Sequence, residues 1–311
     1  MRYDDVLGLI GDTPLVGIHE LSPNPAVRVF AKLEGQNPGG SSKDRIALKM
    51  VEVAEQQGVL HPGDTILEPS SGNTGIGLAI VAKRRGYALR VVMPENVSIE
   101  RRQLLEIFGA DVVLSPAEEG SNGAIRLSEK IAADDPKLVR LFQYGNDANP
   151  LAHYETTGPE IWRDCPDVDV FVAGLGTSGT LMGVGRYLKE RKPSVQVVAV
   201  EPPSGELVQG LRNLEDGFVP PIFDPDVLDR KFIVRPRESI EWLRRLLDEC
   251  QVFAGISSGA AVAGAAKIAG ELDGGTIVTV LPDGGWKYLS SGAWTDDLDE
   301  VVERATKINY W

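Results

Sequence analysis

The chain has 311 residues, of which 42% are hydrophobic and 25% charged, and its formal net charge at pH 7 is −13. This length lies near the size at which one hydrophobic core divides into two domains, and the composition is that of an ordinary globular protein. The acidic excess argues against nucleic-acid binding, which favours a basic surface, and no apolar run is long enough to cross a membrane.

Cysteine and histidine are scarce. Cys165 and Cys250 lie far apart and form no C-x-x-C pair, so we expect free thiols in a reducing compartment. The three histidines, His19, His61 and His153, are scattered, so no metal site is expected. The first residues carry acidic side chains and do not resemble a signal peptide. We therefore expect a cytoplasmic protein.

Short apolar runs alternate with helical patterns along the chain. The runs span residues 65–69, 89–94, 111–116, 168–174, 195–202 and 276–285. This alternation predicts βαβ units and a mainly parallel sheet, and the continuous apolar character predicts strands that are covered on both faces. Residues 145–162 are rich in turn formers and could join two α/β halves. Residues 201–229 form a proline-rich stretch of a length that is usually functional in a compact domain.

The first loop with chemical potential is NPGGSSKDR, residues 37–45. Ser41 or Ser42 can cap a helix whose apolar residues recur at helical spacing, namely Ala47, Met50, Val51 and Ala54. Lys43 then lies in the first turn, where the helix dipole disfavours a cation. A positive environment lowers the pKa of a lysine, so this placement suits an amine that attacks carbonyls. A solvent-exposed lysine after a turn is the alternative.

The second loop is EPSSGNTG, residues 68–75. Gly72 allows the backbone to approach a ligand closely, and the amides that open the following helix can bind a carboxylate. Asn73 offers both a donor and an acceptor. An ordinary helix cap is the alternative interpretation.

The third loop contains Gly174, Gly176 and Gly179 in a G-x-G-x-x-G pattern after an apolar run. In a dinucleotide-binding fold, Glu201 would stand near the position of a ribose-binding acid, so an NAD enzyme is one hypothesis. However, consecutive amides and hydroxyls at a helix start can hold the phosphate of any ligand. The pattern alone therefore does not identify a dinucleotide.

The fourth loop, within residues 253–267, places Ser257 and Ser258 before a helix of small residues, as an ordinary cap would. Ligands of open α/β sheets bind beyond the carboxyl ends of the strands, so we expect the four loops to converge. Together they call for a ligand with an amine-reactive aldehyde and a phosphate. Pyridoxal phosphate (PLP) has both, whereas NAD explains neither Lys43 nor Asn73.

Four motifs in this order and spacing resemble the cysteine synthase (O-acetylserine sulfhydrylase) family of fold-type II PLP enzymes: GGSSKDR, SSGNTG, GTSGT and GISSGA. The resemblance runs from residue 11 to residue 290. It implies an α/β fold of two open, mainly parallel twisted sheets flanked by helices, similar to the tryptophan synthase β subunit. A smaller domain (40–146) and a larger one (1–39 and 147–311) would hold PLP in the cleft between them.

The resemblance also implies roles for individual residues. Lys43 matches the Schiff-base lysine, Asn73 the residue that bonds the ring hydroxyl of the cofactor, and Ser257 the hydroxyl that faces the pyridine nitrogen. The phosphate loop would comprise Gly176, Thr177, Ser178, Gly179 and Thr180. The substrate would be held by Ser70, Ser71, Asn73, Thr74 and Gln143. Two positions depart from the family pattern, since Ser70 replaces the more usual threonine and Ser178-Gly179 replaces Gly-Gly.

The implied reaction is a β-replacement through an aminoacrylate intermediate that yields L-cysteine. Residues 210–229 resemble an actinobacterial-type branch that uses O-phosphoserine and a thiocarboxylated sulfur-carrier protein, and Arg212 would receive the substrate phosphate. A guanidinium suits phosphate far better than a neutral acetyl group. An exposed loop arginine is the alternative for Arg212.

Several alternatives stay open. The chain could be an O-acetylserine sulfhydrylase that uses free sulfide, an enzyme resembling cystathionine β-synthase, or a catalytically silent binding protein, although the intact Lys43 argues against the last. Because the family is usually dimeric, we expect a homodimer. Tyr310 and Trp311 could fold over the mouth of the site, or pack on the outer surface or at a dimer contact.

Overall fold

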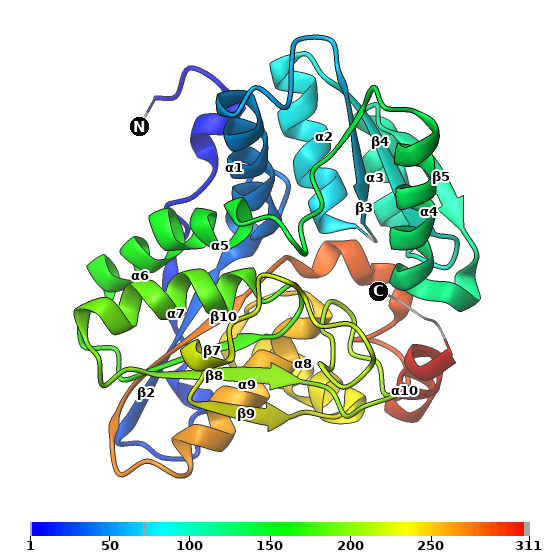
Figure 1. Ribbon diagram of the computed structural model, residues 1–311. Helices are drawn as coiled ribbons and strands as arrows, with labels where there is room; N and C mark the ends of the chain where they lie inside the picture. The colour runs from blue at the N-terminus through cyan, green and yellow to red at the C-terminus, as the bar shows by residue number, and fades with distance from the viewer. Residues whose placement is uncertain (1, 71, 308–311) are drawn as a thin grey trace.

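The computed structural model describes residues 2–70 and 72–307, and its strands form two sheets (Figure 1). The larger sheet has the order β1-β2-β10-β7-β8-β9, with strands Leu15–Gly17, Val27–Leu33, Gly275–Leu281, Val170–Gly174, Gln196–Glu201 and Arg230–Ile233. The smaller sheet has the order β5-β4-β3-β6, with strands Asp111–Ser115, Ala88–Pro94, Thr65–Pro69 and Leu138–Arg140. Only β1 runs antiparallel to its neighbour among the described strands, which confirms the predicted fold of two mainly parallel sheets.

Helices connect the strands and cover the sheets. Those that accompany the smaller sheet are α1 (Lys43–Gln56), α2 (Asn73–Arg85), α3 (Ile99–Ile107) and α4 (Gly120–Asp134). Those that accompany the larger sheet are α5 (Ala148–Ala152), α6 (Gly158–Asp164), α7 (Gly179–Arg191), α8 (Pro236–Cys250), α9 (Ile256–Ala269) and α10 (Leu298–Lys307). Short 3₁₀ turns span Val6–Leu9, His19–Leu21, Glu34–Gln36, Ala117–Glu119, Pro225–Val227 and Gly285–Ser291, the last named η7.

Strand β7 shows why the apolar runs lack alternation. Val170 and Val172 pack into the core formed with α8 and α9, whereas Phe171 and Ala173 pack into the core formed with α6 and α7. Successive side chains of a strand point to opposite faces, so a strand with helices on both sides must be apolar throughout.

The segment expected to be a turn-rich connection is helical instead. Residues 148–164 form α5, a π-helical turn over His153–Thr157, and α6. Asn149 and Pro150 are buried here, and packing against α7 overrides their turn preference. In contrast, residues 202–224 contain no regular element, in agreement with the predicted irregular stretch.

Three further properties bear on the expectations. Within residues 2–70 and 72–307, every helix is too short or too polar to span a bilayer. The same residues contain no group of three His, Cys, Asp or Glu side chains that could hold a metal ion. Cys165 and Cys250 are both free thiols.

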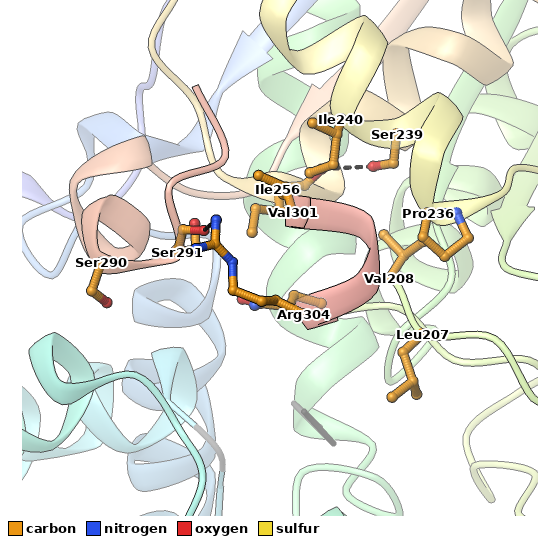
Figure 2. A pocket seen from close by; sticks show the side chains of 11 residues that line it. Leu207, Val208, Pro236, Ser239, Ile240, Ile256, Ser290, Ser291, Val301 and Arg304 are labelled. Atoms are coloured by element: carbon orange, nitrogen blue, oxygen red, sulfur yellow. Dashed lines mark hydrogen bonds between the residues drawn. The ribbon is translucent and has the colours of Figure 1, made fainter. Parts of the chain in front are cut away.

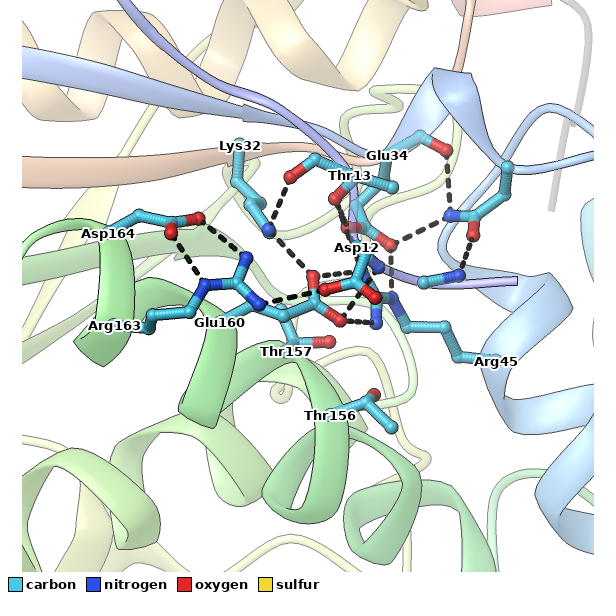
Figure 3. A network of polar contacts seen from close by, with 12 residues as sticks. Asp12, Thr13, Lys32, Glu34, Arg45, Thr156, Thr157, Glu160, Arg163 and Asp164 are labelled. Atoms are coloured by element: carbon cyan, nitrogen blue, oxygen red, sulfur yellow. Dashed lines mark hydrogen bonds and ion pairs between the residues drawn. The ribbon is translucent and has the colours of Figure 1, made fainter. Parts of the chain in front are cut away.

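A buried network of charges fixes the start of α1 (Figure 3). The Arg45 guanidinium contacts Glu34 Oε2 at 2.7 Å and Glu160 Oε1 at 2.6 Å, and Lys32 Nζ lies 2.7 Å from Glu160 Oε2. Two cations thereby balance two carboxylates, as burial of charge requires. Because Lys32 lies on β2 and Glu160 on α6, the network ties the helix that begins with Lys43 to the larger sheet.

The network predicts an acid-labile contribution to stability. Burial opposes ionisation of Glu34, but the charge and hydrogen bonds of Arg45 prevail and lower its pKa to about 2. Because this lies below the ordinary value of 4.5, the contribution is present above pH 4.5 and lost as the pH falls toward 2. We expect a loss of about 3 kcal/mol over that window. The free energy of unfolding should be measured by urea denaturation at a series of pH values. Over that window, its slope against pH should be smaller in Glu34→Gln than in the wild-type protein, by up to the equivalent of one proton. Equal slopes in the two proteins would contradict the assignment.

Candidate active site

Lys43 is the first residue of α1, and the loop before it is pinned to the end of β10. Ser42 N donates to Pro282 O at 2.8 Å, and Ser41 pairs with Asp283 in an isolated bridge. Of the two candidate caps, Ser41 makes the contact, since its Oγ accepts a 3.2 Å hydrogen bond from Lys43 N. Ser42 makes no side-chain cap to the helix, and its Oγ instead accepts from Lys43 Nζ at 3.2 Å.

The surroundings of Lys43 favour its neutral amine. Burial lowers the pKa of Lys43 below the ordinary lysine value, although the carboxylates of Asp283, Glu34 and Asp44 act in the opposite direction. A neutral amine is the form that attacks an aldehyde and accepts a proton. The pKa of Lys43 is thus shifted in the predicted direction, but the cause is burial and not the positive environment expected from the sequence.

The loop at residues 176–180 leads from β7 into the N-terminus of α7. A Cβ at Gly176 would lie 2.8 Å from Gly210 O, so the chain is tightly packed here. Ser178 has φ +71°, in the left-handed region where the more usual glycine has no steric cost. Its Oγ is buried and has no hydrogen-bond partner among the described residues. A helix N-terminus with an unsatisfied hydroxyl beside it suits an anion, and the phosphate of PLP fits this position.

The predicted site residues line two adjoining cavities, of about 110 and 40 Å³. The first is bordered by Lys43, Ser70, Asn73, Thr74, Gln143, Gly176, Thr177, Arg212 and Ser257. The second is bordered by Lys43, Ser257 and Gly176, Thr177, Ser178, Gly179 and Thr180. The structure thus brings together segments from both sheets, with Lys43 and Ser257 common to the two cavities. Ser71, Tyr310 and Trp311 lie outside the described residues.

The substrate loop is held by its own hydroxyl groups. Ser70 Oγ accepts hydrogen bonds from Gly72 N at 3.3 Å and Gly75 N at 3.1 Å, so the serine hydroxyl satisfies two amides at the start of α2. Thr74 Oγ1 donates to Gln143 Oε1 at 2.7 Å. These contacts place the loop against residues 142–143, which themselves donate backbone hydrogen bonds to Glu68.

One prediction for individual residues needs correction, and one alternative is excluded. Ser257 and Ser258 lie inside the first turn of α9 and do not precede it, because Gly255 occupies the cap position. Arg212 is only 6% exposed, so the alternative of an exposed loop arginine is wrong. Its backbone N donates to Leu175 O at 2.7 Å, and its guanidinium lies 5.4 Å from the centre of the Tyr144 ring. The arginine is thus fixed beside the phosphate loop and borders the larger cavity.

Glu201 does not act as a ribose-binding acid. It is buried, its Oε1 pairs with Lys231 Nζ at 2.8 Å, and it lines neither cavity. Its other oxygen accepts from Leu214 N at 3.5 Å, so the residue anchors the irregular segment after β8. The G-x-G-x-x-G match is thereby left without the acid that an NAD site needs.

Sequence reasoning missed several residues at the site. Arg101 borders the larger cavity, with its guanidinium 4.6 Å from the centre of the Tyr288 ring and Nη2 3.2 Å from Gln209 Oε1. Tyr288 and Lys287 follow β10, and Arg101 follows β4. The rule that ligands bind beyond the carboxyl ends of strands would have drawn attention to both segments.

A third cavity, of about 60 Å³, lies beside the start of α8 and the helix α10 (Figure 2). Its walls include the apolar side chains of Leu207, Val208, Ile240 and Val301, with Arg304 at one side. No lysine, cysteine or carboxylate borders this cavity among the described residues. Its serines therefore have no lysine, histidine or carboxylate beside them in the described lining to act as a base, and we place the chemistry in the two cavities that Lys43 borders.

Gly179→Ala is expected to damage the phosphate loop. A Cβ would lie 1.8 Å from Asn149 Oδ1, and the amide of Asn149 also donates to Gln143 O and Thr177 Oγ1. Displacement of Asn149 should cost about 1–3 kcal/mol and weaken PLP retention. Thermal melting and equilibrium dialysis with PLP test both effects. Gly274→Ala, whose nearest contact would be an ordinary 3.4 Å, is the control. Equal effects of the two substitutions would contradict the prediction.

Two mainly parallel sheets, with Lys43 and the N-terminus of α7 bordering one cavity, form the arrangement of a fold-type II PLP-dependent enzyme. A family model described as "Pyridoxal-phosphate dependent enzyme" matches residues 6–283, and the chain belongs to this family.

Three similar proteins indicate which enzymes of the family this chain resembles. Cysteine synthase B of Pseudomonas aeruginosa is 41% identical over 295 residues, covering 94% of this chain and 98% of its own length. A cysteine synthase of Staphylococcus aureus is 43% identical over 304 residues, with the same coverage. Among solved structures, that of an O-ureido-L-serine synthase is 41% identical, with a TM-score of 0.89 and coverage of 94% of this chain and 96% of the other.

Proposed function

We propose that this chain is a cysteine synthase, which replaces the β-substituent of O-phosphoserine, or of O-acetylserine, by sulfur to give L-cysteine. The observation that carries the proposal is the single cavity bordered by Lys43, Asn73, Ser257 and Arg212. The relatives named cysteine synthase, which match nearly the whole chain, support it.

In the proposed mechanism, PLP supplies an electron sink that stabilises negative charge at the α-carbon of the substrate. Lys43 holds the cofactor and, once displaced by the substrate amine, takes the α-proton and later returns it. Its lowered pKa suits this work, because a base must be unprotonated near neutral pH. The amides that open α2, together with Thr74 and Gln143, orient the substrate carboxylate.

Ser257 would determine the type of reaction, and Arg212 would determine which serine ester is preferred. A serine hydroxyl beside the pyridine nitrogen, unlike an aspartate carboxylate, would not keep that nitrogen protonated. The ring would then be a weaker electron sink, which would favour departure of a β-substituent over long-lived carbanions. Arg212 carries a fixed positive charge on a buried part of the cavity wall. A guanidinium binds phosphate through two parallel hydrogen bonds, so we propose that O-phosphoserine is the preferred donor.

A second candidate is suggested by the structural neighbour whose name specifies O-ureido-L-serine as its product. The two functions differ in the group that is joined to the β-carbon. Initial rates should be measured for the PLP-loaded protein with each serine ester and with sulfide, a thiocarboxylated carrier protein, or hydroxyurea. Cysteine formation that is fastest from O-phosphoserine supports the proposal. A rate with hydroxyurea that exceeds both sulfur donors would replace it by the second candidate.

The proposal also includes the expected domains, oligomeric state, location and protein partner. We propose a smaller domain of residues 40–146 and a larger domain of residues 1–39 and 147–311, a homodimer, a cytoplasmic location and a small sulfur-carrier protein as partner. The four strands of the smaller sheet all lie between Thr65 and Arg140, which supports the division. Light scattering tests the dimer, and a binding titration with a thiocarboxylated carrier protein tests the partner.

A further inference from the structure

A second buried lysine stands at the site. Lys287, in η7, is only 1% exposed. Its Nζ donates to Gly39 O at 2.7 Å, Gly40 O at 3.2 Å and Asn73 Oδ1 at 2.7 Å. An ammonium group has three N–H donors and no acceptor, so all three donors of Lys287 are engaged. The residue therefore links the loop before Lys43 to the start of α2.

This contact fixes the orientation of the Asn73 amide. Because Lys287 cannot accept a hydrogen bond, the atom of Asn73 that faces it must be the oxygen. The amide nitrogen donates one hydrogen to Asp283 Oδ2 at 2.7 Å, and that carboxylate is held in turn by the Tyr288 hydroxyl at 2.5 Å. An amide nitrogen carries two hydrogens, so one N–H of Asn73 remains for the cavity that the residue borders.

We propose that Lys287 is a positioning residue, which makes Asn73 present an N–H to the ring oxygen of PLP and places a positive charge behind that amide. The inference rests on the proposed role of Asn73 at the cofactor. A donor aimed at the ring oxygen, with a cation behind it, stabilises the ionised form of that oxygen.

The charges around Lys287 allow it to serve as that cation near neutral pH. The pKa of Lys287 is lowered to about 8, chiefly by burial; the carboxylates of Asp283 and Asp44 oppose this shift, and the Arg101 guanidinium acts in the same direction as burial. Below that value the ammonium form predominates, and it satisfies the carbonyl oxygens of Gly39 and Gly40, which only a donor can do.

The test uses the purified protein loaded with PLP. Lys287→Gln removes the charge while keeping a polar group of similar reach. We expect the ratio of the absorption band of the neutral ring oxygen to that of the ionised ring oxygen to rise about tenfold, or the dissociation constant of PLP to rise by a similar factor. Lys192→Met is the control, because Lys192, like Lys287, donates to a backbone carbonyl, but it pairs with a carboxylate and lies at the far end of α7. It should change neither quantity.

A double-mutant cycle separates positioning from a general structural role. In an Asn73→Ala background, Lys287→Gln should change the band ratio and the dissociation constant by less than about twofold, since the effect acts through Asn73. The same tenfold change in that background, or no change in the wild-type background, would overturn the inference. If Lys287→Gln does not fold, Lys287→Met makes the test, because it removes the ammonium group while keeping the aliphatic chain. An absorption band of the ionised ring oxygen as strong as that of the wild-type protein would then overturn the inference. Failure of the wild-type protein to bind PLP would instead refute the proposed function.

Discussion

Lys43→Ala is expected to abolish turnover, with a fall in kcat of roughly 10⁴-fold or more. The substitution removes both the covalent attachment of the cofactor and the group that moves the α-proton. Burial already lowers the pKa of Lys43 toward a neutral amine, and no other lysine borders the two site cavities among the described residues. Cysteine formation under initial-rate conditions measures the loss.

Lys49→Ala provides the matched control for this prediction. Lys49 lies on the same helix, six residues further along, and makes partly exposed ion pairs with Glu52 and Glu155. Its replacement should leave the rate unchanged within about twofold, since such pairs contribute little. A Lys43→Ala protein that retained the wild-type rate would show that the proposed mechanism is wrong.

Arg212→Ala is expected to lower kcat/KM for O-phosphoserine by about 100-fold and to change the value for O-acetylserine by less than about threefold. The side chain is buried in the cavity wall, beside the rings of Tyr144 and Phe218. A phosphate leaving group gains charge-assisted hydrogen bonds there, whereas a neutral acetyl group gains none of comparable strength. Parallel steady-state kinetics with the two donors measure the difference.

Two further variants sharpen the comparison. Arg212→Lys keeps the charge but loses the two-pronged geometry, so its loss with O-phosphoserine should be intermediate. Arg230→Ala is the control, because Arg230 lies on β9 and pairs with Glu271 near the surface. An equal loss with both donors in Arg212→Ala would remove the argument for phosphate selection.

The strands that could be predicted from the sequence are those with helices on both faces. Strands β3, β4, β5, β7, β8 and β10 are apolar runs bounded by turn signals. Strand β2 was not predicted, since its run VRVFAKL contains Lys32, a buried charge that is balanced by Glu160 and donates to Thr13 O. The helical nature of residues 148–164 was missed for a related reason, because its buried asparagine and proline follow tertiary packing and not local preference.

The site residues also divide into those that a local sequence pattern predicts and those that only long-range contacts place. Asn73 and the loop at 176–180 were predicted because each follows a recognisable strand and begins a helix, whereas Lys43 was predicted from its place in the first turn of a helix after the GGSS loop. Lys287 could not be predicted in this way, since its ammonium group finds acceptors 214 to 248 residues away in the sequence. A contact of that range leaves no local pattern, and it becomes visible only when the two sheets are placed together.

The most direct test of the account is to find which lysine carries the cofactor. The PLP-loaded protein is reduced with borohydride, digested, and mapped by mass spectrometry. The account predicts a phosphopyridoxyl group on Lys43 alone, because its amine borders the cavity while all donors of Lys287 are engaged elsewhere. A phosphopyridoxyl group on Lys287, or on neither lysine, would contradict it.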